Sequence, residues 1–303
     1  MGYVISVTNQ KGGVGKTLTT SSLASILTTR GYKVLSIDMD PQCNLDQVAG
    51  EPGPIDPLDD VTPSILKVLS QECGIKEAIV HTQIGDLVRA VPALSQWTGY
   101  SLISRPDVKK MLDEGASPED IGKLVIERYQ KGWGAIEHKR LDWEIREIRN
   151  EYDFVFLDTN PSLTMLTLNS LYTADYVLIP AFSEETSRKA IIELNDTMEE
   201  LRASNPAMHA KILGILIGKF KRHTNVAKAY AKHIKKIANK IGTDIFESKI
   251  RDGIVASEYT NRKMDVIRYA PGSGIAQDYQ AFAAEFLDRI NKLEGGDNVG
   301  KEK

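Results

Sequence analysis

Short apolar runs alternate along the chain with longer stretches in which apolar residues recur every three or four positions. The short runs predict buried strands, and their alternation with helical stretches is typical of a doubly wound, mostly parallel sheet. Strands are expected at residues 3–9, 33–38, 87–91, 154–158, 176–180 and 212–218. The predicted fold class is therefore α/β, with helices on both faces of the sheet.

Residues 100–150 contain more helix than one connection between two strands requires. Three helices are predicted there, at 106–114, 117–130 and 136–150. The second begins with Ser-Pro-Glu-Asp at position 117, a typical helix start with a cap, a proline and early acids. We interpret this region as a helical insertion, which either elaborates the fold or contacts a partner or a second copy of the chain.

Two other segments lack the apolar pattern of regular elements. Residues 50–62 are rich in Gly, Pro and Asp and are typical of a loop. Residues 294–303 are predicted to form a flexible polar tail. The remaining residues, 1–293, are expected to form a single domain without internal repeats.

The composition argues against several protein classes. Hydrophobic residues make up 42% of the chain, which is ordinary for a globular protein. No apolar run approaches the ~18 residues of a transmembrane helix, and the first strand leaves no room for a signal peptide. The cysteines, Cys43 and Cys73, form no CxxC pair, so an iron–sulfur or metal site is not expected. We therefore expect a cytoplasmic protein.

The charge is distributed unevenly, although its total is only −3. Residues 219–240 contain eight basic residues and no acid, so the rest of the chain carries −11. Such an asymmetry indicates an anionic partner.

A glycine-rich turn connects the first predicted strand to a helix. Its glycines tolerate positive φ and carry no side chain, so successive N–H groups can point inward at the start of the helix. Lys16 is then placed to reach the β- and γ-phosphates of a nucleotide, and the Thr17 hydroxyl to bind Mg²⁺. The turn predicts a nucleoside triphosphate site formed by Gly12, Gly13, Val14, Gly15, Lys16, Thr17 and Leu18.

The turn departs from the ordinary P-loop, because Gln10 occupies the position of the first glycine and Lys11 adds a second lysine. This arrangement resembles the deviant Walker A motif of the ParA/MinD/nitrogenase-iron-protein superfamily. The resemblance implies a P-loop NTPase domain over residues 1–293. It also implies that Lys11 crosses the interface of a homodimer and touches the ATP of the partner.

Acidic residues follow two of the predicted strands. The run from Asp38 through Asp40 to Gln42 resembles the D-x-D-P-Q motif of the family. This implies that Asp40 orients the attacking water and that Asp38 supports the magnesium shell; the alternative is that both acids cap a helix or a turn. Asp158 closes an apolar strand and resembles the Walker B acid, which holds Mg²⁺ through water. Asn160 replaces the first proline of the family's Asp-x-Pro-Pro run.

The resemblance covers nearly the whole chain except residues 100–140. Arg251 and Asp252 stand where relatives place the purine base, which backbone groups would recognise. No guanine-specific NKxD motif stands in a suitable place, which favours ATP over GTP. The expected ligands are therefore ATP and Mg²⁺, and the expected reaction is hydrolysis of ATP.

Within the superfamily, the basic run favours a ParA-like DNA segregation ATPase. The resemblance implies an ATP-dependent homodimer that binds nonspecific double-stranded DNA near the nucleoid and is released when a ParB-like centromere-binding protein stimulates hydrolysis. Lysines from 228 to 240 recur every four residues and would line one helix face, although a merely solvated face is the alternative. The predicted DNA surface comprises Lys221, Arg222, Lys228, Lys232, Lys235, Lys236, Arg262 and Lys263, with Arg268 beside them.

Other members of the superfamily fit the sequence less well. A MinD-like membrane-associated ATPase needs a basic amphipathic helix at its C-terminus, whereas residues 276–293 form an acidic one. We therefore expect no membrane partner. Iron–sulfur relatives need cysteines that this chain lacks. A ParA-like ATPase that positions a cargo other than DNA remains an alternative.

Overall fold

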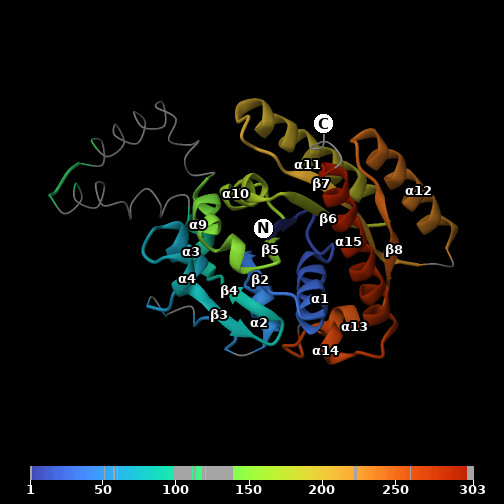
Figure 1. The fold of residues 1–303 in the computed structure, drawn as a ribbon, viewed down its shortest axis with the longest axis horizontal. Helices are drawn as coiled ribbons and strands as arrows, with labels where there is room; N and C mark the ends of the chain where they lie inside the picture. The colour runs from blue at the N-terminus through green and yellow to red at the C-terminus, as the bar shows by residue number, and fades with distance from the viewer. Residues whose placement is uncertain are drawn as a thin grey trace.

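A central sheet of eight strands organises the computed structural model, in the order β3-β4-β2-β5-β1-β6-β7-β8 (Figure 1). The structure describes residues 2–50, 52–56, 59, 61–97, 111, 114–117, 120, 139–221, 224–259 and 261–298, the last five of these as backbone. Neighbouring strands are parallel except for β3 and β4. The strands are β1 Tyr3–Val7, β2 Val34–Met39, β3 Ile79–Thr82, β4 Gly85–Val88, β5 Phe154–Thr159, β6 Tyr176–Phe182, β7 Lys211–Phe220 and β8 Ile245–Arg251. The predicted α/β class is confirmed.

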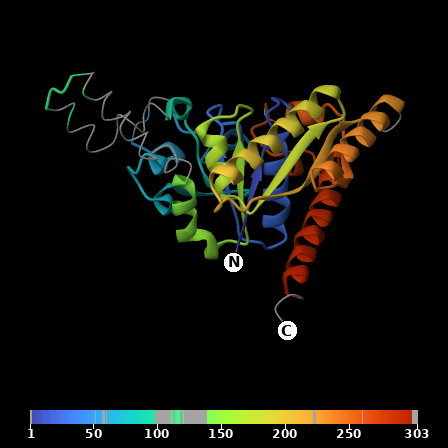
Figure 2. The ribbon, with the colours of Figure 1, turned by 90° about the horizontal axis from the view of Figure 1, so that it is seen from above.

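Helices cover both faces of the sheet, so the hydrophobic core lies in one layer on each face. One layer contains α1 Lys16–Thr29, α2 Asn44–Ala49, α14 Val266–Tyr269 and α15 Gly274–Asn298. The opposite face carries α3 Ile65–Leu69, α4 Ile75–Ala78, α9 Arg140–Ile148, α10 Met165–Thr173, α11 Glu185–Ser204 and α12 Asn225–Lys240. Shorter pieces are η1 Pro92–Gln96, η2 Arg149–Glu151 and α13 Val255–Glu258. In Figure 1, α1 in blue lies beside α15 in red, and Figure 2 shows α11 beside α12.

Strand β5 shows how the sequence produces these two layers. Successive side chains of a strand point to opposite faces, so every second residue contacts the same helices. Phe154 and Phe156 pack against Phe286 of α15, and their ring centroids lie 5.6 and 6.1 Å, respectively, from that of Phe286. Val155 and Leu157 belong to the core on the other face, which also contains residues of α9 and α10. A strand buried on both faces explains why residues 154–157 are all apolar.

The strand predictions were correct in the centre of the sheet and wrong near its edges. Strand β4 covers Gly85–Val88, whereas the predicted strand covered 87–91, because the buried apolar residues Ala90 and Val91 lie beyond the end of the strand. The edge strand β3 and strand β8 were not predicted. Strand β3 is mostly half-exposed, and β8 mixes apolar and charged residues, so neither presents an apolar run.

The helical predictions outside the sheet have mixed outcomes. Helix α9 falls within the predicted helix at 136–150 and begins at Arg140. The predicted helices at 106–114 and 117–130 lie almost entirely outside the described residues. Helix α15 continues through Asn298, so the tail predicted to begin at residue 294 starts as helix; residues 299–303 lie outside the described part.

No helix in the described ranges combines the length and the apolar character needed to cross a membrane.

Asp175 joins three segments at the amino ends of β1 and β6. Its carboxylate accepts hydrogen bonds from the Val4 amide at 2.8 Å and from His209 Nε2 at 3.2 Å, and it pairs with Arg149 at 2.5 Å. Burial opposes ionisation, but the hydrogen bonds from His209, Arg149 and Val4 prevail and lower the pKa of Asp175. The hydrogen bond between His209 and Asp175 raises the pKa of His209.

We expect Asp175→Asn to lower the free energy of unfolding by about 2 kcal/mol, because Arg149 would lose a largely buried partner. The Asp175 contribution is present above its unfolded pKa near 3.8 and is lost as pH falls through the lower folded pKa. The His209 contribution is present below its unfolded pKa near 6.5 and is lost as pH rises through the raised folded pKa. Urea unfolding at about pH 5 and about pH 8 measures the His209 effect, and unfolding at about pH 5 and about pH 3 measures the onset of the Asp175 effect. In the wild type, the free energy of unfolding should fall between about pH 5 and about pH 8 as His209 loses its proton. This fall should be absent in Asp175→Asn and in the control His209→Gln. An unchanged pH dependence in either variant would contradict the pairing of His209 with Asp175 as its cause.

Candidate nucleotide site

A cavity of about 410 Å³ opens at the carboxyl ends of the central strands. Strand β1 lies between β5 and β6, so the turn after β1 enters the crevice where ligands bind in open α/β sheets. The predicted loop residues from Gly12 to Leu18 all line this cavity, together with Asp40 and the ends of β6, β7 and β8. The glycine-rich turn and the strand-end residues therefore meet in one place.

The backbone of the turn adopts the shape that phosphate binding requires at two of its three glycines. Gly13 and Gly15 have φ values of 70° and 89°, in the left-handed region where a side chain would be strained. Gly12 does not adopt positive φ, and a Cβ there would make an ordinary contact with Pro161. Gly15 precedes α1 without a side-chain cap, so the first N–H groups of this helix are available to an anion.

Lys16 lies inside the turn as a buried cation, with 7% of its surface exposed. Its Nζ donates to the carbonyl oxygens of Asn9 at 3.2 Å and Lys11 at 3.3 Å. Burial lowers the pKa of Lys16, while the carboxylates of Asp158 and Asp40 oppose this shift. An ammonium group has three hydrogens, so one remains for an anionic ligand.

Asp158 presents an unsatisfied oxygen to the site. Thr20 donates to Oδ1 at 3.1 Å, whereas the buried Oδ2 has no hydrogen-bond partner in the described part of the chain. Burial raises the pKa of Asp158 to about 7, against the hydrogen bonding of Thr17 and the charge of Lys16. A cation in place of a proton would satisfy this oxygen, as expected for an acid that faces hydrated Mg²⁺.

The donors around Asp158 fit magnesium better than a metal held entirely by protein. Across the described ranges, no three His, Cys, Asp or Glu side chains form a group that could hold a metal ion. Magnesium characteristically keeps several waters and binds through one or two protein oxygens plus phosphates. The hydroxyl of Thr17 and the carboxylate of Asp158 fit that requirement.

Asp38 lies beside Asp158 because β2 and β5 pair in register at these two residues. Its carboxylate accepts hydrogen bonds from the amides of Asp40 at 2.9 Å, Leu45 at 3.1 Å and Asp46 at 3.4 Å. Burial raises its pKa well above the ordinary value, and the nearby carboxylates of Asp46 and Asp158 add to the shift. Asp38 therefore caps the start of α2, which was the alternative to a role at magnesium. Its contribution to a magnesium shell stays a prediction.

Asp40 lines the cavity from the turn after β2 and is 8% exposed. One of its oxygens accepts a hydrogen bond from the Gln42 amide at 3.0 Å. This bond, and the Asp40 amide bound to Asp38, hold the carboxylate in a defined place. An oriented carboxylate beside a phosphate site can position a water molecule for attack.

Lys11 points toward its own chain in this structure. Its Nζ lies 2.6 Å from Glu184 Oε2 and 2.5 Å from the hydroxyl of Thr186, at the start of α11. The predicted contact across a dimer interface is therefore compatible with this conformation only if Lys11 leaves Glu184.

The cavity also has an apolar part, most of which the sequence analysis did not predict. It is lined by Phe182, Leu216, Ile250, Tyr259 and Tyr279. Tyr279 of α15 is buried in the core, and its side chain also reaches the cavity. Such a surface suits the flat face of a purine base.

Of the two residues predicted at the base, Arg251 lines the cavity and Asp252 does not. The Arg251 side chain is held by Asp278 of α15, with Nε–Oδ2 and Nη2–Oδ1 distances of 2.7 and 2.8 Å. Asp252 lies 3.6 Å from Lys221 instead. Lys219, which was not predicted, lines the cavity with a φ of 45° and its Nζ 4.5 Å from the Phe182 ring.

A comparison with known protein families decides what this site is. The family model described as the CobQ/CobB/MinD/ParA nucleotide binding domain matches residues 5–266. The chain belongs to this family. The resemblance inferred from the deviant Walker A motif is thereby confirmed, and the chain is an ATPase of the ParA/MinD class.

Individual members of the family match nearly the full chain. The chromosome partitioning protein ParA of Myxococcus xanthus is 29% identical over 290 residues, covering 95% of this chain and 89% of that protein. The chromosome-partitioning ATPase Soj of Thermus thermophilus is 28% identical over 291 residues, covering 95% and 96%. A solved structure of cobyrinic acid a,c-diamide synthase from Mycobacterium smegmatis, with bound ADP and magnesium, is 25% identical with a TM-score of 0.64, covering 90% and 96%.

The part of the basic run from residue 225 to 240 forms helix α12 of this ParA/MinD-class chain, as the spacing of its lysines predicted. Thr224 caps the helix by accepting a hydrogen bond from the Ala227 amide at 3.3 Å. The helix buries small and apolar residues every three or four positions, so the opposite face is left to charged side chains. The exposed lysines on that face are Lys228, Lys232, Lys236 and Lys240, which we call the lysine stripe.

The other residues predicted to bind DNA are in less favourable positions. Lys221 and Lys235 lie 3.6 and 3.7 Å from Asp252 and Glu247, which offset part of their charge. Arg222 lies outside the described residues. Exposed Arg262 and Lys263 follow α13, with Arg262 over the ring of Tyr269. The placement of Arg268 on this surface was wrong, because its guanidinium is bound to the buried Asp265.

Proposed function

We propose that this chain is a ParA-type DNA segregation ATPase whose ATP-bound homodimer binds double-stranded DNA without sequence preference. A ParB-like centromere-binding protein would stimulate hydrolysis and release the dimer, so the protein would associate with the nucleoid in the cytoplasm. The observation that carries this proposal is the lysine stripe on α12, in a ParA/MinD-class domain whose predicted phosphate-loop residues line one cavity.

The phosphate site supports hydrolysis of ATP through charge and position. Lys16 and the N–H groups of the turn would bind the phosphates and offset the charge that develops in the transition state. Asp40 would orient the attacking water. Mg²⁺, bound by Thr17 and through water by Asp158, would supply further charge neutralisation at the phosphates.

Lys11 would connect the nucleotide state to dimerisation. In the single chain its amine is occupied by Glu184 and Thr186. A γ-phosphate in the facing subunit offers a stronger anionic partner than one half-exposed carboxylate, so ATP would favour the dimer and ADP would not. ATP binding and DNA binding would thereby be coupled through assembly.

The lysine stripe would bind DNA through the phosphate backbone. Lysine is a point charge that neutralises phosphates without reading bases, so a row of exposed lysines supports binding that is independent of sequence. A membrane-bound function receives less support, because Tyr279, Phe282, Phe286 and Ile290 of the C-terminal helix are buried in the core. They are not free to enter lipid.

Charge reversal of the stripe tests this proposal. The triple variant Lys228→Glu, Lys232→Glu and Lys236→Glu should weaken DNA binding at least about tenfold and reduce the salt dependence of the affinity. Its basal ATPase activity should be unchanged, because these side chains lie outside the nucleotide cavity. Binding of random-sequence duplex DNA in the presence of ATP, at two salt concentrations, measures the effect.

A matched control separates the stripe from net charge. Reversal of Lys33, Lys76 and Lys292, which are exposed on other parts of the chain, changes the total charge equally. This control variant should bind DNA more tightly than the stripe variant. Equal losses in the two variants, or none in the stripe variant, would reject the stripe as the DNA surface and favour a cargo other than DNA.

A further inference from the structure

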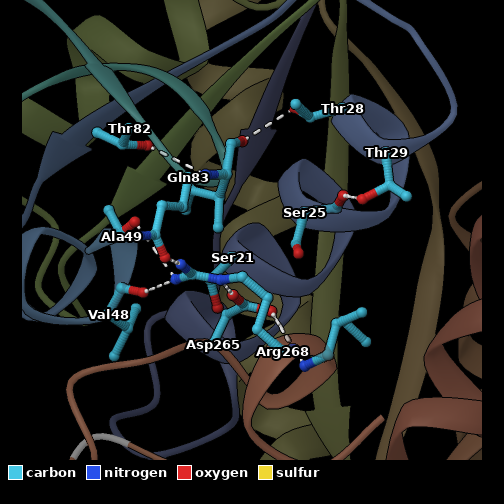
Figure 3. Close-up of polar contacts among 12 residues, drawn as sticks. Ser21, Ser25, Thr28, Thr29, Val48, Ala49, Thr82, Gln83, Asp265 and Arg268 are labelled. Atoms are coloured by element: carbon cyan, nitrogen blue, oxygen red, sulfur yellow. Dashed lines mark hydrogen bonds and ion pairs between the residues drawn. The ribbon is translucent and has the colours of Figure 1, made fainter. Parts of the chain in front are cut away.

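Arg268 occupies the meeting point of segments that lie far apart in the sequence (Figure 3). Its Nη2 donates to the carbonyl oxygens of Val48 at 2.8 Å and Ala49 at 3.3 Å. Its Nε pairs with Asp265, and its Nη1 donates to the side chain of Gln83 in the turn between β3 and β4. The side chain of Arg268 is 20% exposed and that of Asp265 is fully buried.

On one side, Arg268 holds the end of the helix that follows Asp40. Val48 and Ala49 are the last residues of α2, where carbonyl groups lack partners within the helix and need outside donors. The start of α2 is fixed by Asp38, which accepts hydrogen bonds from the amides at 45 and 46. The turn from Asp40 to α2 is closed by a hydrogen bond from the Cys43 amide to the Asp40 carbonyl oxygen at 2.9 Å. A short, tightly bonded segment therefore connects Arg268 to Asp40.

On the other side, Arg268 belongs to α14, the helix that Asp265 begins. Asp265 caps α14 by accepting hydrogen bonds from the amides of Ile267 at 3.0 Å and Arg268 at 3.2 Å. This short helix lies between the cavity-lining residues Tyr259 and Tyr279 in sequence. Its Val266 is buried in the same core as α1, the helix of the phosphate loop.

Gly50 leaves space for this arrangement. It follows α2 with a φ of 100°, and a Cβ at this position would lie 3.3 Å from Nη1 of Arg268. The guanidinium thus fills the space beside the end of α2 closely.

We propose that Arg268 is a positioning residue for hydrolysis, which ties α14 to the end of α2 and thereby holds Asp40 in place. The proposal rests on the proposed role of Asp40 in orienting water. Loss of the guanidinium would remove the charged donor from the α2 carbonyl groups and loosen the turn that carries Asp40. The phosphate loop has its own contacts, so turnover should fall while nucleotide binding is retained.

The first test compares kcat, KM and the affinity for a non-hydrolysable ATP analogue in Arg268→Gln, Arg268→Lys and the wild type. We expect Arg268→Gln to lower kcat by about 10- to 100-fold, because small displacements of a catalytic group have effects of this size. The analogue affinity should change less than about threefold, and Arg268→Lys should recover part of kcat. The control Arg30→Gln, which removes an exposed arginine bound to Gln280, should match the wild type. An unchanged kcat in Arg268→Gln would overturn the proposal.

A second variant separates positioning from stability, because Arg268→Gln alone leaves Asp265 buried without its partner. The double variant Asp265→Asn/Arg268→Gln removes that buried charge and should recover the thermal midpoint. If Arg268 positions Asp40 through α2, kcat stays low in the double variant. Full recovery of kcat would assign Arg268 a structural role and reject the proposal.

The role of Asp40 itself is tested separately with Asp40→Ala in the same assay. Wild-type turnover in Asp40→Ala would reject the proposed function of Asp40. A loss of turnover there, combined with normal turnover in Arg268→Gln, would reject only the inference about Arg268.

Discussion

The Lys16→Ala variant is expected to lose ATP binding, with an affinity at least about 100-fold weaker than that of the wild type. Lys16 is the buried cation of the phosphate turn, and its neighbours include the carboxylates of Asp158 and Asp40. Without its ammonium group, the triphosphate would face these acids with too little positive charge. Hydrolysis would be lost as a consequence.

Titration with a fluorescent ATP analogue in the presence of Mg²⁺ measures this loss directly. The control Lys33→Ala removes an exposed lysine at the start of β2, away from the cavity, and should bind as the wild type does. Circular dichroism should show that Lys16→Ala remains folded. Analogue binding at wild-type affinity in a folded Lys16→Ala variant would refute the phosphate site.

The Asp40→Ala variant is expected to bind ATP and to hydrolyse it about 10²- to 10⁴-fold more slowly. Asp40 lines the cavity but lies outside the phosphate turn, so its loss should affect the water and not the binding of the phosphates. If ATP holds the dimer together, a variant that cannot hydrolyse it should accumulate as dimer.

The Asp40→Asn variant separates the charge from the fold of the turn. An asparagine keeps an oxygen that can accept the Gln42 amide, yet it removes the carboxylate charge. Phosphate release at saturating ATP and size-exclusion chromatography are the measurements. Slow turnover in both variants would assign the effect to the charge, whereas slow turnover in Asp40→Ala alone would indicate that Asp40 chiefly shapes the turn. Wild-type turnover in both would exclude Asp40 from catalysis.

Much of the fold could be predicted from the sequence because the central strands are buried on both faces. In a strand such as β5 the residues packed on both faces, 154–157, are then all apolar, which leaves a clear run in the sequence. The half-exposed β3 and the mixed β8 carry no such run. β3 is instead placed by its antiparallel pairing with β4, and β8 by its pairing with β7 across α12.

The phosphate site could be predicted because its geometry is local. Gly13 and Gly15 adopt the left-handed conformation, and the lysine and threonine follow directly on α1. Contacts between distant residues could not be predicted in this way. Lys11 binds Glu184, which lies 173 positions away in the sequence, and no local sequence pattern predicts this pair.

Charge alone predicted the basic surface less well than the glycine-rich motif predicted the phosphate site. Arg268 was assigned to the DNA surface as a cation near other cations, but it is bound to the buried Asp265. An acid three residues before an arginine, at the start of a helix, is the signal that could have indicated this internal pair. The lysine stripe was predicted correctly as one exposed helix face, because four-residue spacing is a property of the helix itself.

The most direct test of the central claim is the binding of random-sequence double-stranded DNA by the wild-type protein with ATP, with ADP and without nucleotide, each at two salt concentrations. The proposed coupling of the nucleotide site to the lysine stripe predicts binding that requires ATP and weakens steeply as salt increases. Equal binding in all three nucleotide states would contradict the coupling, and no binding in any state would contradict the DNA-binding function.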